Sequence, residues 1–239
     1  MRLVLVRHGQ TPSNVSGLLD TDPPGPGLTE LGRQQADALP EMLAGEPIEA
    51  VYASTATRAQ LTAAPLARAL GLNVLVRRGL REIAAGNWEM LDDEVSVHGY
   101  LALIGRWMEG RSDERSPGPK GESGREVLQR FDEVVAEVAS TGVAGAALVA
   151  HGAVNRFWAS VNAENLPADF GASHPLRNAG IVVLSGDPDQ GWIMHSWTGA
   201  DIGHGWANQG SANQPVPAAA ADSTDEDPFD EQIPVPGRP

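Results

Sequence analysis

Short apolar runs recur along the chain, and each has the length and residue types of a buried β-strand. They lie at Leu3–Val6, Ala50–Ala53, Asn73–Val76 and Ala146–Ala150. Amphipathic stretches, with apolar residues three or four positions apart, lie between several of these runs. The alternation of strand, loop and helix predicts an α/β three-layer sandwich, with a mostly parallel central sheet and helices on both faces.

Four helices are expected from the amphipathic stretches and from the residues that bound them. Their ranges are Thr29 to about Leu43, Ser54 or Thr55 to about Leu70, about Ser123 to Ser140, and Gly152 to about Val161. The hydroxyl residues are interpreted as N-caps, and Gly71 as the residue that ends the second helix. The expected core face of the first helix carries Leu31, Ala38, Leu39, Met42 and Leu43, with Pro40 as an interruption.

The regular pattern breaks from about residue 84 to 122. This segment is interpreted as a small cap insertion over the carboxyl edge of the sheet, where α/β proteins bind ligands. One helix is expected within Leu91–Met108. Farther along, Ala179–Leu184 and Trp192–Trp197 predict a hairpin at the edge of the sheet, because a turn-forming Asp-Pro-Asp segment joins them.

Net charge limits the partners of the chain. The 239 residues carry a net charge of -14, which argues against nucleic acid or an anionic membrane as a partner. Part of this charge lies in residues 208–239, an acidic, Pro- and Ala-rich segment that is expected to be a disordered tail. Residues 1–207 are then expected to form one domain. An anionic substrate must be attracted by a local cluster of arginines rather than by the overall field.

Other features of the composition narrow the chemistry. The chain has no cysteine, which excludes disulfides, thiolate metal sites and a cysteine nucleophile. No apolar segment is long enough for a signal peptide or a membrane span, so a cytoplasmic location is expected.

The first apolar run ends in a block of residues suited to phosphoryl chemistry, Arg7-His8-Gly9-Gln10-Thr11. A cation beside an imidazole suits a site that receives a phosphoryl group and lets the histidine attack it. Pro12 and Ser13 predict a short helical turn whose amides point toward an anion, and the side-chain amide of Asn14 can donate to the same anion.

Six segments together resemble the signature of the histidine phosphatase superfamily, the phosphoglycerate-mutase-like fold. They occur in family order across about residues 1 to 200. The segments are Arg7-His8-Gly9-Gln10-Thr11 with Asn14, Leu28-Thr29-x-x-Gly32-x-x-Gln35-Ala36, Ser54-x-x-x-Arg58-Ala59-x-x-Thr62, Leu80-x-Glu82-x-x-x-Gly86-x-Trp88-Glu89, Gly121-Glu122-Ser123 with Arg130, and Ala150-His151-Gly152.

The resemblance implies a role for each matched residue. His8 would be the nucleophile that forms a phosphohistidine, and Glu82 would give a proton to the leaving alcohol. Glu89 is expected to be structural. The other residues expected at the site are Arg7, Arg58 and His151, which would bind phosphoryl oxygens, and Asn14, Gly9, Gln10, Thr11, Gly152 and Asn178, which would contact the substrate.

The loop after the acid favours a phosphatase over a mutase. Phosphoglycerate mutases carry Glu-Arg-x-Tyr-Gly in this loop, whereas Glu82 is followed here by Ile83-Ala84-Ala85-Gly86. The resemblance therefore implies metal-independent hydrolysis of a small phosphorylated metabolite, with no cofactor. A phosphoglycerate-type phosphomutase and a non-catalytic phospho-ligand-binding protein are the alternatives, and a homodimer is a possible assembly.

Two other sets of residues are interpreted as having no part in the reaction. His195, Asp201 and His204 lack the spacing of metal ligands, so no metal site is expected there. Ser54 and Ser123 have no nucleophile-elbow context and are interpreted as helix caps.

Overall fold

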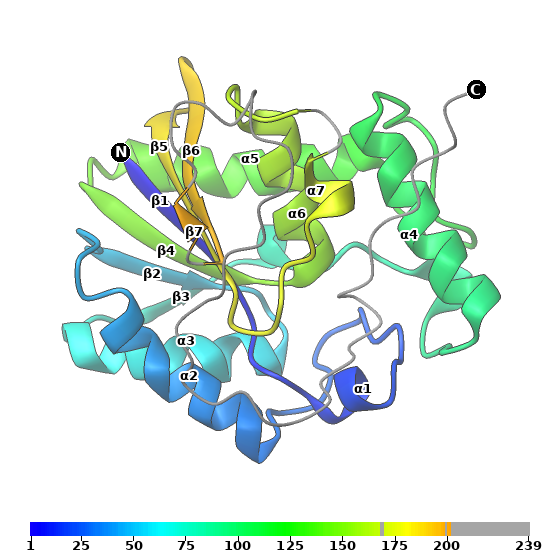
Figure 1. Ribbon diagram of the computed structural model, residues 1–239, viewed down its shortest axis with the longest axis horizontal. Helices are drawn as coiled ribbons and strands as arrows, with labels where there is room; N and C mark the ends of the chain where they lie inside the picture. Colours follow the sequence, from blue (N-terminus) through cyan, green and yellow to red (C-terminus); the bar gives the residue numbers. More distant parts are fainter. Residues whose placement is uncertain (168–169, 199, 202–239) are drawn as a thin grey trace.

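A seven-stranded sheet forms the centre of the protein (Figure 1). The computed structural model describes residues 1–167, 170–198 and 200–201, so the expected tail at 208–239 lies outside the described residues. The strand order is β3-β2-β4-β1-β5-β6-β7. The strands are β1 (Arg2–Arg7), β2 (Ala50–Ala53), β3 (Val74–Val76), β4 (Gly145–Ala150), β5 (Ile181–Asp187), β6 (Gly191–Trp197) and β7 (Ala200–Asp201).

The four strands predicted from the apolar runs are mutually parallel, and the expected hairpin extends the sheet beside β1. The β1 strand pairs in parallel with β4, and β2 pairs in parallel with both β4 and β3. The β5 and β6 strands form the antiparallel hairpin, and β7 adds a short last strand. Because β1, β2 and β4 run the same way, the residues that follow them meet at one edge of the sheet.

Seven α-helices and two 3₁₀ turns are assigned in the described part of the chain. They are α1 (Pro12–Val15), α2 (Glu30–Met42), α3 (Thr57–Leu70), η1 (Arg78–Leu80), η2 (Gly86–Trp88), α4 (Glu94–Met108), α5 (Gly124–Ser140), α6 (Gly152–Asn162) and α7 (Phe170–Ser173). Figure 1 shows α2 and α3 on one side of the sheet and α5 and α6 on the other. None of the described helices is long and apolar enough to cross a membrane.

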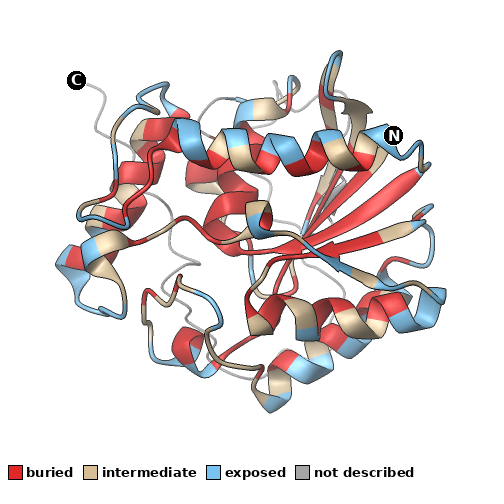
Figure 2. Ribbon diagram, turned by 180° about the vertical axis from the view of Figure 1, so that it is seen from behind, coloured by how far each residue is buried: buried red, intermediate tan, exposed pale blue. Residues whose placement is uncertain are grey.

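The residues of β1 show why the fold has three layers. Leu3 and Leu5 belong to the larger core cluster, which includes side chains of α4, α5 and α6. Val4 and Val6 belong to the second cluster, together with side chains of α2 and α3. Alternate residues of a strand point to opposite faces, so an uninterrupted apolar strand needs helices on both sides (Figure 2).

Most predicted helix ends are confirmed, with one exception. Thr29 caps α2, Ser123 caps α5 in a reciprocal capping box with Glu126, and Gly71 ends α3 in the left-handed conformation. The prediction that Ser54 or Thr55 caps α3 is wrong. This helix begins at Thr57, and its N-cap residue, Ala56, makes no side-chain cap. The hydroxyl of Ser54 bonds the ring of His151 instead, a tertiary contact that no local pattern contains.

The predicted core face of α2 is also wrong in part. Met42 is 57% exposed, and the buried stripe consists of Gly32, Ala36, Leu39 and Leu43. The close approach of α2 to the backbone of Gln10 determines which face of the helix is buried, because a Cβ on Gly32 would lie 2.1 Å from the carbonyl oxygen of Gln10. Pro40 lies within the helix without ending it.

The segment interpreted as a cap insertion contributes to the main core. Its expected helix is α4, and the side chains of Tyr100, Ile104 and Trp107 are buried in the larger core cluster. The α4 helix contacts α6 and α7, and it therefore covers the side of the protein next to the helix that follows β4.

We predict that Gly32→Ala destabilises the protein, although alanine is the better helix former by about 1 kcal/mol. Overpacking against the backbone of Gln10 should outweigh this gain and leave a net loss of about 1–2 kcal/mol in the free energy of unfolding. Urea denaturation measures the change. Gly45→Ala is the matched control because no atom lies within 4 Å of its added Cβ. Equal urea midpoints for the two variants would contradict the prediction.

Candidate active site

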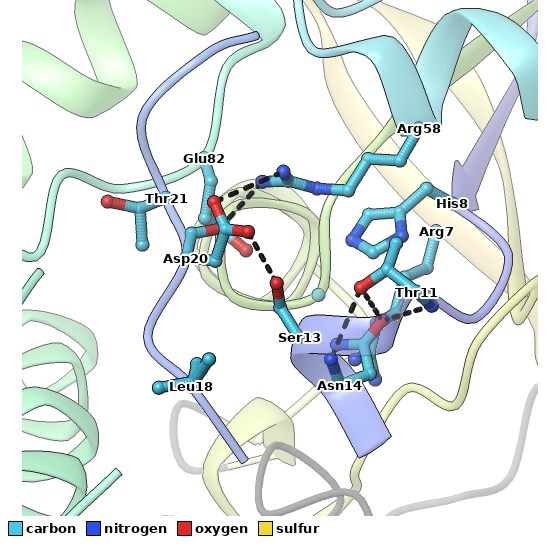
Figure 3. Close-up of a pocket in the computed structure, with 11 residues that line it drawn as sticks. Arg7, His8, Thr11, Ser13, Asn14, Leu18, Asp20, Thr21, Arg58 and Glu82 are labelled. Atoms are coloured by element: carbon cyan, nitrogen blue, oxygen red, sulfur yellow. Dashed lines mark hydrogen bonds and ion pairs between the residues drawn. The ribbon is translucent and has the colours of Figure 1, made fainter. Parts of the chain in front are cut away.

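A narrow pocket at the carboxyl edge of the parallel strands collects most of the predicted site residues (Figure 3). Its volume is about 20 Å³, room for little more than a water molecule. The residues that line it are Arg7, His8, Thr11, Ser13, Asn14, Leu18, Asp20, Thr21, Arg58, Glu82 and Gly152. Figure 3 shows side chains from several separate segments directed toward this common space.

The tautomer of His8 is fixed by its own backbone. The Nδ1 atom lies 2.8 Å from the carbonyl oxygen of Gly9, which can only accept a hydrogen bond. Nδ1 therefore carries the proton, and Nε2 carries a lone pair. Burial, followed by the charges of Arg58 and Arg7, holds the pKa of His8 well below its usual value. The ring is neutral near pH 7, which is the form that a nucleophile requires.

Arg7 lies beside His8 and is almost fully buried. Its Nη1 donates to the carbonyl oxygen of Leu176 at 2.7 Å. Gly152, the first residue of α6, admits the guanidinium, because a Cβ at that position would lie 3.1 Å from Arg7 Nε. Gly152 thus permits a buried cation to lie against the start of α6.

Arg58 reaches the pocket from the first turn of α3 and meets Asp20. Its Nη2 donates to the backbone oxygen of Asp20 at 2.8 Å, and its Nη1 lies 3.7 Å from Asp20 Oδ1. Nη1 is buried and makes no hydrogen bond among the described residues. Ser13 Oγ donates to the other carboxylate oxygen of Asp20 at 2.5 Å. A cation with an unused donor therefore lines the pocket.

His151 follows β4 and lies beside His8 and Arg58. Its Nδ1 accepts from Arg58 Nε at 3.4 Å, and its Nε2 lies 2.8 Å from Ser54 Oγ. Both ring nitrogens are thus engaged, and the residue is absent from the pocket lining. Burial, with Arg58 and His8 as smaller causes, holds the pKa of His151 well below its usual value. His151 therefore holds Arg58 and packs against His8, whose ring centroid is 5.1 Å away, and its contact with phosphoryl oxygens stays a prediction.

Asn14 is oriented by three donors. Its Oδ1 accepts from the amide and the hydroxyl of Thr11, both at 3.0 Å, and from Asn178 Nδ2 at 3.3 Å. The Thr11 hydroxyl in turn caps α1, so the predicted short helical turn is present. Because Oδ1 is occupied, the side-chain NH₂ of Asn14 remains as its donor at the pocket. Asn178 also donates to the His8 carbonyl oxygen at 3.1 Å, and it holds the site from outside the pocket lining.

Gly9 and Gln10, which were expected to contact the substrate, form hydrogen bonds with side chains of α3 and of the cap of α2. The Gly9 amide donates to Thr62 Oγ1 at 2.9 Å, and a Cβ on Gly9 would lie 2.5 Å from the carbonyl oxygen of Gly32. The Gln10 side-chain oxygen accepts from Thr29 Oγ1 at 2.7 Å. Neither residue lines the pocket. They tie the loop after β1 to the helices on one face of the sheet.

The carboxyl group of Glu82 is buried against the first residues of α6. Its two carboxyl oxygens accept from the amides of Ile83 at 2.8 Å, Val154 at 2.9 Å and Ala153 at 3.1 Å. Burial raises the pKa of Glu82, and this effect outweighs the opposite influence of the three amides and of Arg58. Desolvation thus makes a protonated Glu82 more accessible than an exposed glutamate would be.

A largely buried network of ion pairs holds the backbone of the loop that carries Glu82. The sequence did not reveal this role of the network. Arg130 binds the carboxylate of Glu122 at 2.9 Å and donates to the backbone oxygens of Gly79, Arg81 and Glu82. Arg81 binds the same carboxylate. The Gly121-Glu122-Ser123 motif with Arg130 was the available signal, but it did not reveal which loop the pair would hold.

The residues between α1 and α2 supply further pocket contacts that sequence reasoning missed. Leu18, Asp20 and Thr21 lie in an irregular loop, which gives no periodic signal. Glu89, interpreted as structural, accepts from the Thr21 amide at 2.8 Å and from its hydroxyl. The Ala85 amide donates to the same hydroxyl at 3.0 Å, so Thr21 joins the two loops.

No group of three potential metal ligands occurs within the residues that the structure describes. His195 Nε2 lies 2.6 Å from Ser185 Oγ. The side chain of Asp201 and the whole of His204 lie outside the described part.

The chain matches known proteins over most of its length. The model of the histidine phosphatase superfamily (branch 1) matches residues 3–198. PE-PGRS family protein PE_PGRS11 of Mycobacterium tuberculosis is 37% identical over 83% of this chain, which spans only 36% of that protein. Glucosyl-3-phosphoglycerate phosphatase of Mycolicibacterium vanbaalenii is 33% identical, over 82% of this chain and 93% of its own length.

A comparison with solved structures also finds a protein of this family. Mycobacterial glucosyl-3-phosphoglycerate phosphatase in complex with VO3 superposes with a TM-score of 0.67. It is 31% identical to this chain, and the match covers 82% of this chain and 98% of that structure.

We predict that the free energy of unfolding falls as the pH is lowered from 8 to 5.5. The pKa values of His8 and His151 are lowered in the folded state. Below about pH 6.5, the pKa of an unperturbed histidine, these two residues therefore bind protons more readily in the unfolded chain than in the folded one. The contribution of the two neutral histidines to the free energy of unfolding is complete above that pH. It is lost below that pH by about 1.4 kcal/mol per pH unit for each proton. Glu82, whose pKa is raised, contributes in the opposite direction.

Denaturation with urea across this pH range tests the effect. His8→Asn should reduce the slope below pH 6.5, whereas the same change at the exposed His98 should leave it as in the wild type. A flat wild-type profile would contradict the assignment of buried neutral histidines.

Proposed function

The chain belongs to the histidine phosphatase superfamily, and we propose that it hydrolyses phosphomonoesters of small metabolites through a phosphohistidine at His8. Its family and its phosphatase relatives make it a phosphoric monoester hydrolase. The observation that carries the proposed mechanism is the bond from His8 Nδ1 to the Gly9 oxygen. This bond leaves the Nε2 lone pair of a neutral ring beside two buried arginines.

In the first step, His8 Nε2 attacks phosphorus, and the bond between phosphorus and the alcohol oxygen breaks. Arg7 and Arg58 neutralise the phosphoryl oxygens with their guanidinium groups, and Asn14 donates from its side-chain amide. Because these groups are fixed before the reaction, little reorganisation is needed as charge develops. The mechanism uses arginine cations in the role that metal ions fill in other phosphatases.

Glu82 acts at the leaving oxygen. A carboxyl group with a raised pKa can hold the proton that the alkoxide takes, and the dianionic substrate raises that pKa further. In the second step water attacks phosphorus, the bond to Nε2 breaks, and Glu82 takes the proton of the water. Inorganic phosphate and the free enzyme result.

The relatives suggest a first substrate to examine, glucosyl-3-phosphoglycerate. The observed loop after Glu82 supports hydrolysis over mutase chemistry, because Ile83 and Ala85 are fully buried and present no group to a substrate. The net charge of -14 supports the proposal that neither nucleic acid nor an anionic membrane is a partner. We also propose residues 1–207 as the catalytic unit.

We predict that His8→Asn abolishes turnover, because no other pocket residue carries a comparable nucleophile. With a generic aryl phosphate, activity should fall to less than about 1% of wild type, given that removal of a nucleophile costs several orders of magnitude. Rapid quenching of the wild type should trap a phosphoenzyme that is labile in acid and stable in base. His98→Asn is the control for loss of a histidine at the surface. Activity in His8→Asn comparable to wild type would sink the assignment.

We further predict that Glu82→Gln slows alkyl phosphates far more than activated aryl phosphates. A general acid is worth about 10²- to 10⁴-fold, but a nitrophenolate leaves with little need for a proton. Single-turnover measurement of phosphoenzyme formation isolates this step from the later attack by water. Equal losses on both kinds of ester would show that Glu82 shapes the pocket and transfers no proton.

A further inference from the structure

The catalytic pocket contains a carboxylate that the proposed reaction does not use, that of Asp20. Asp20 lines the pocket together with Glu82 and the two buried arginines. Figure 3 shows its side chain joined to those of Arg58 and Ser13. Glu82 is the proposed acid, whereas a second negative charge repels the anion that the arginines attract. The presence of Asp20 in an anion site therefore calls for a role of its own.

The backbone of Asp20, rather than its carboxylate, holds Arg58. Arg58 Nη2 donates to the backbone oxygen of Asp20 at 2.8 Å, whereas Nη1 lies 3.7 Å from Oδ1, beyond hydrogen-bond distance. Nη1 makes no hydrogen bond among the described residues. The carboxylate thus adds a charge beside Arg58 but no hydrogen bond, so the holding of Arg58 does not account for it.

Other contacts fix the backbone on both sides of Asp20. The amide of Leu19 donates to the backbone oxygen of Leu91 at 2.9 Å. On the other side, the amide of Thr21 donates to the carboxylate of Glu89 at 2.8 Å. Loss of the Asp20 carboxylate would therefore leave its backbone oxygen in place to hold the guanidinium group.

Ser13 fixes the direction of the Asp20 carboxylate. Ser13 Oγ donates to Asp20 Oδ2 at 2.5 Å, and both residues line the catalytic pocket. The side chain of Asp20 is only 9% exposed, so water and salt screen its charge less than that of a surface aspartate. An anion held by Arg7 and Arg58 would therefore lie in the field of Asp20 as well.

The product of the proposed reaction is such an anion. Inorganic phosphate remains beside two buried guanidinium groups after the alcohol has left, and slow release of product limits the rate of many enzymes. A fixed carboxylate in the same pocket lowers the affinity for every bound anion. The accompanying loss of substrate affinity raises KM but leaves the chemical step as it was, because substrate and transition state are repelled alike.

We propose that Asp20 promotes the release of inorganic phosphate, because its carboxylate weakens the hold of Arg7 and Arg58 on the product. This inference rests on the proposed phosphatase function. Asp20 takes no part in the bonds that form or break, and it acts on the anion through its charge.

Titration calorimetry with inorganic phosphate tests this role without requiring turnover. Asp20→Asn removes the charge and keeps both the backbone oxygen and the size of the side chain. The Kd for phosphate should fall about 10-fold, equivalent to about 1.4 kcal/mol, because one repelling charge is lost. Asp20→Ala should lower the Kd as well. Asp37→Asn removes an exposed carboxylate of α2, outside the pocket, and should leave the Kd as in the wild type.

Hydrolysis of a generic aryl phosphate gives a second readout. The inhibition constant of added phosphate should fall about 10-fold in Asp20→Asn, and KM should fall in the same direction without a rise in kcat. If the Asp20 carboxylate served instead to hold Arg58 in place, its loss would weaken the binding of phosphate. The two roles therefore predict changes of opposite sign.

Two results would overturn the inference, and they are distinguishable. Phosphate binding that is unchanged or weaker in both Asp20 variants, with circular dichroism spectra like that of the wild type, would exclude this role while the phosphatase function stands. Absence of aryl phosphate hydrolysis in the wild type would overturn the proposed function, and with it the release of a product, whatever the calorimetry shows.

Discussion

The candidate site depends on two guanidinium groups, those of Arg7 and Arg58, that are buried in a pocket proposed to bind an anion. Burying a charge costs several kcal/mol unless other groups compensate, and the surroundings of Arg7 and Arg58 supply that compensation. The Leu176 carbonyl holds Arg7, whereas Asp20 and His151 hold Arg58. Gly152 leaves the space that Arg7 occupies. Burial and, after it, the same two charges keep His8 neutral, so the groups proposed to bind the phosphoryl oxygens also prepare the proposed nucleophile.

A second set of contacts fixes Glu82, the proposed acid, relative to these charges. Glu82 is bound to amides of α6, the helix that begins directly after His151. Arg130 and Glu122 hold the backbone of the same loop from the side of α5. These hydrogen bonds tie the position of Glu82 to the start of α6. Precise placement of an acid matters because proton transfer requires hydrogen-bond reach to the leaving oxygen.

Elements whose signal is local were predictable from the sequence, whereas contacts between distant segments were not. The apolar runs gave β1, β2 and β4, and Ser123 and Gly71 gave helix ends, because each feature lies within a few consecutive residues. The buried face of α2 depends on the close approach of Gly32 to the backbone of Gln10. The hydrogen bond of Ser54 depends on His151, which lies in a distant segment of the chain. The family motif included Gly9 and Gln10, but it could not show that they bond Thr62 and Thr29, because these partners lie in other segments.

Asp20 explains how an acidic residue can belong to an anion site. Its carboxylate lies 3.7 Å from Arg58 Nη1, too far for a hydrogen bond, and accepts from Ser13 instead. It therefore offsets part of the charge of Arg58 without using the donor at Nη1, which stays available to a phosphoryl oxygen. Arg7 and Arg58 together outweigh the charge of Asp20 in the pocket lining. Because the Coulomb attraction grows in proportion to the charge of the ligand, this excess attracts a dianionic phosphoryl group more strongly than a singly charged carboxylate.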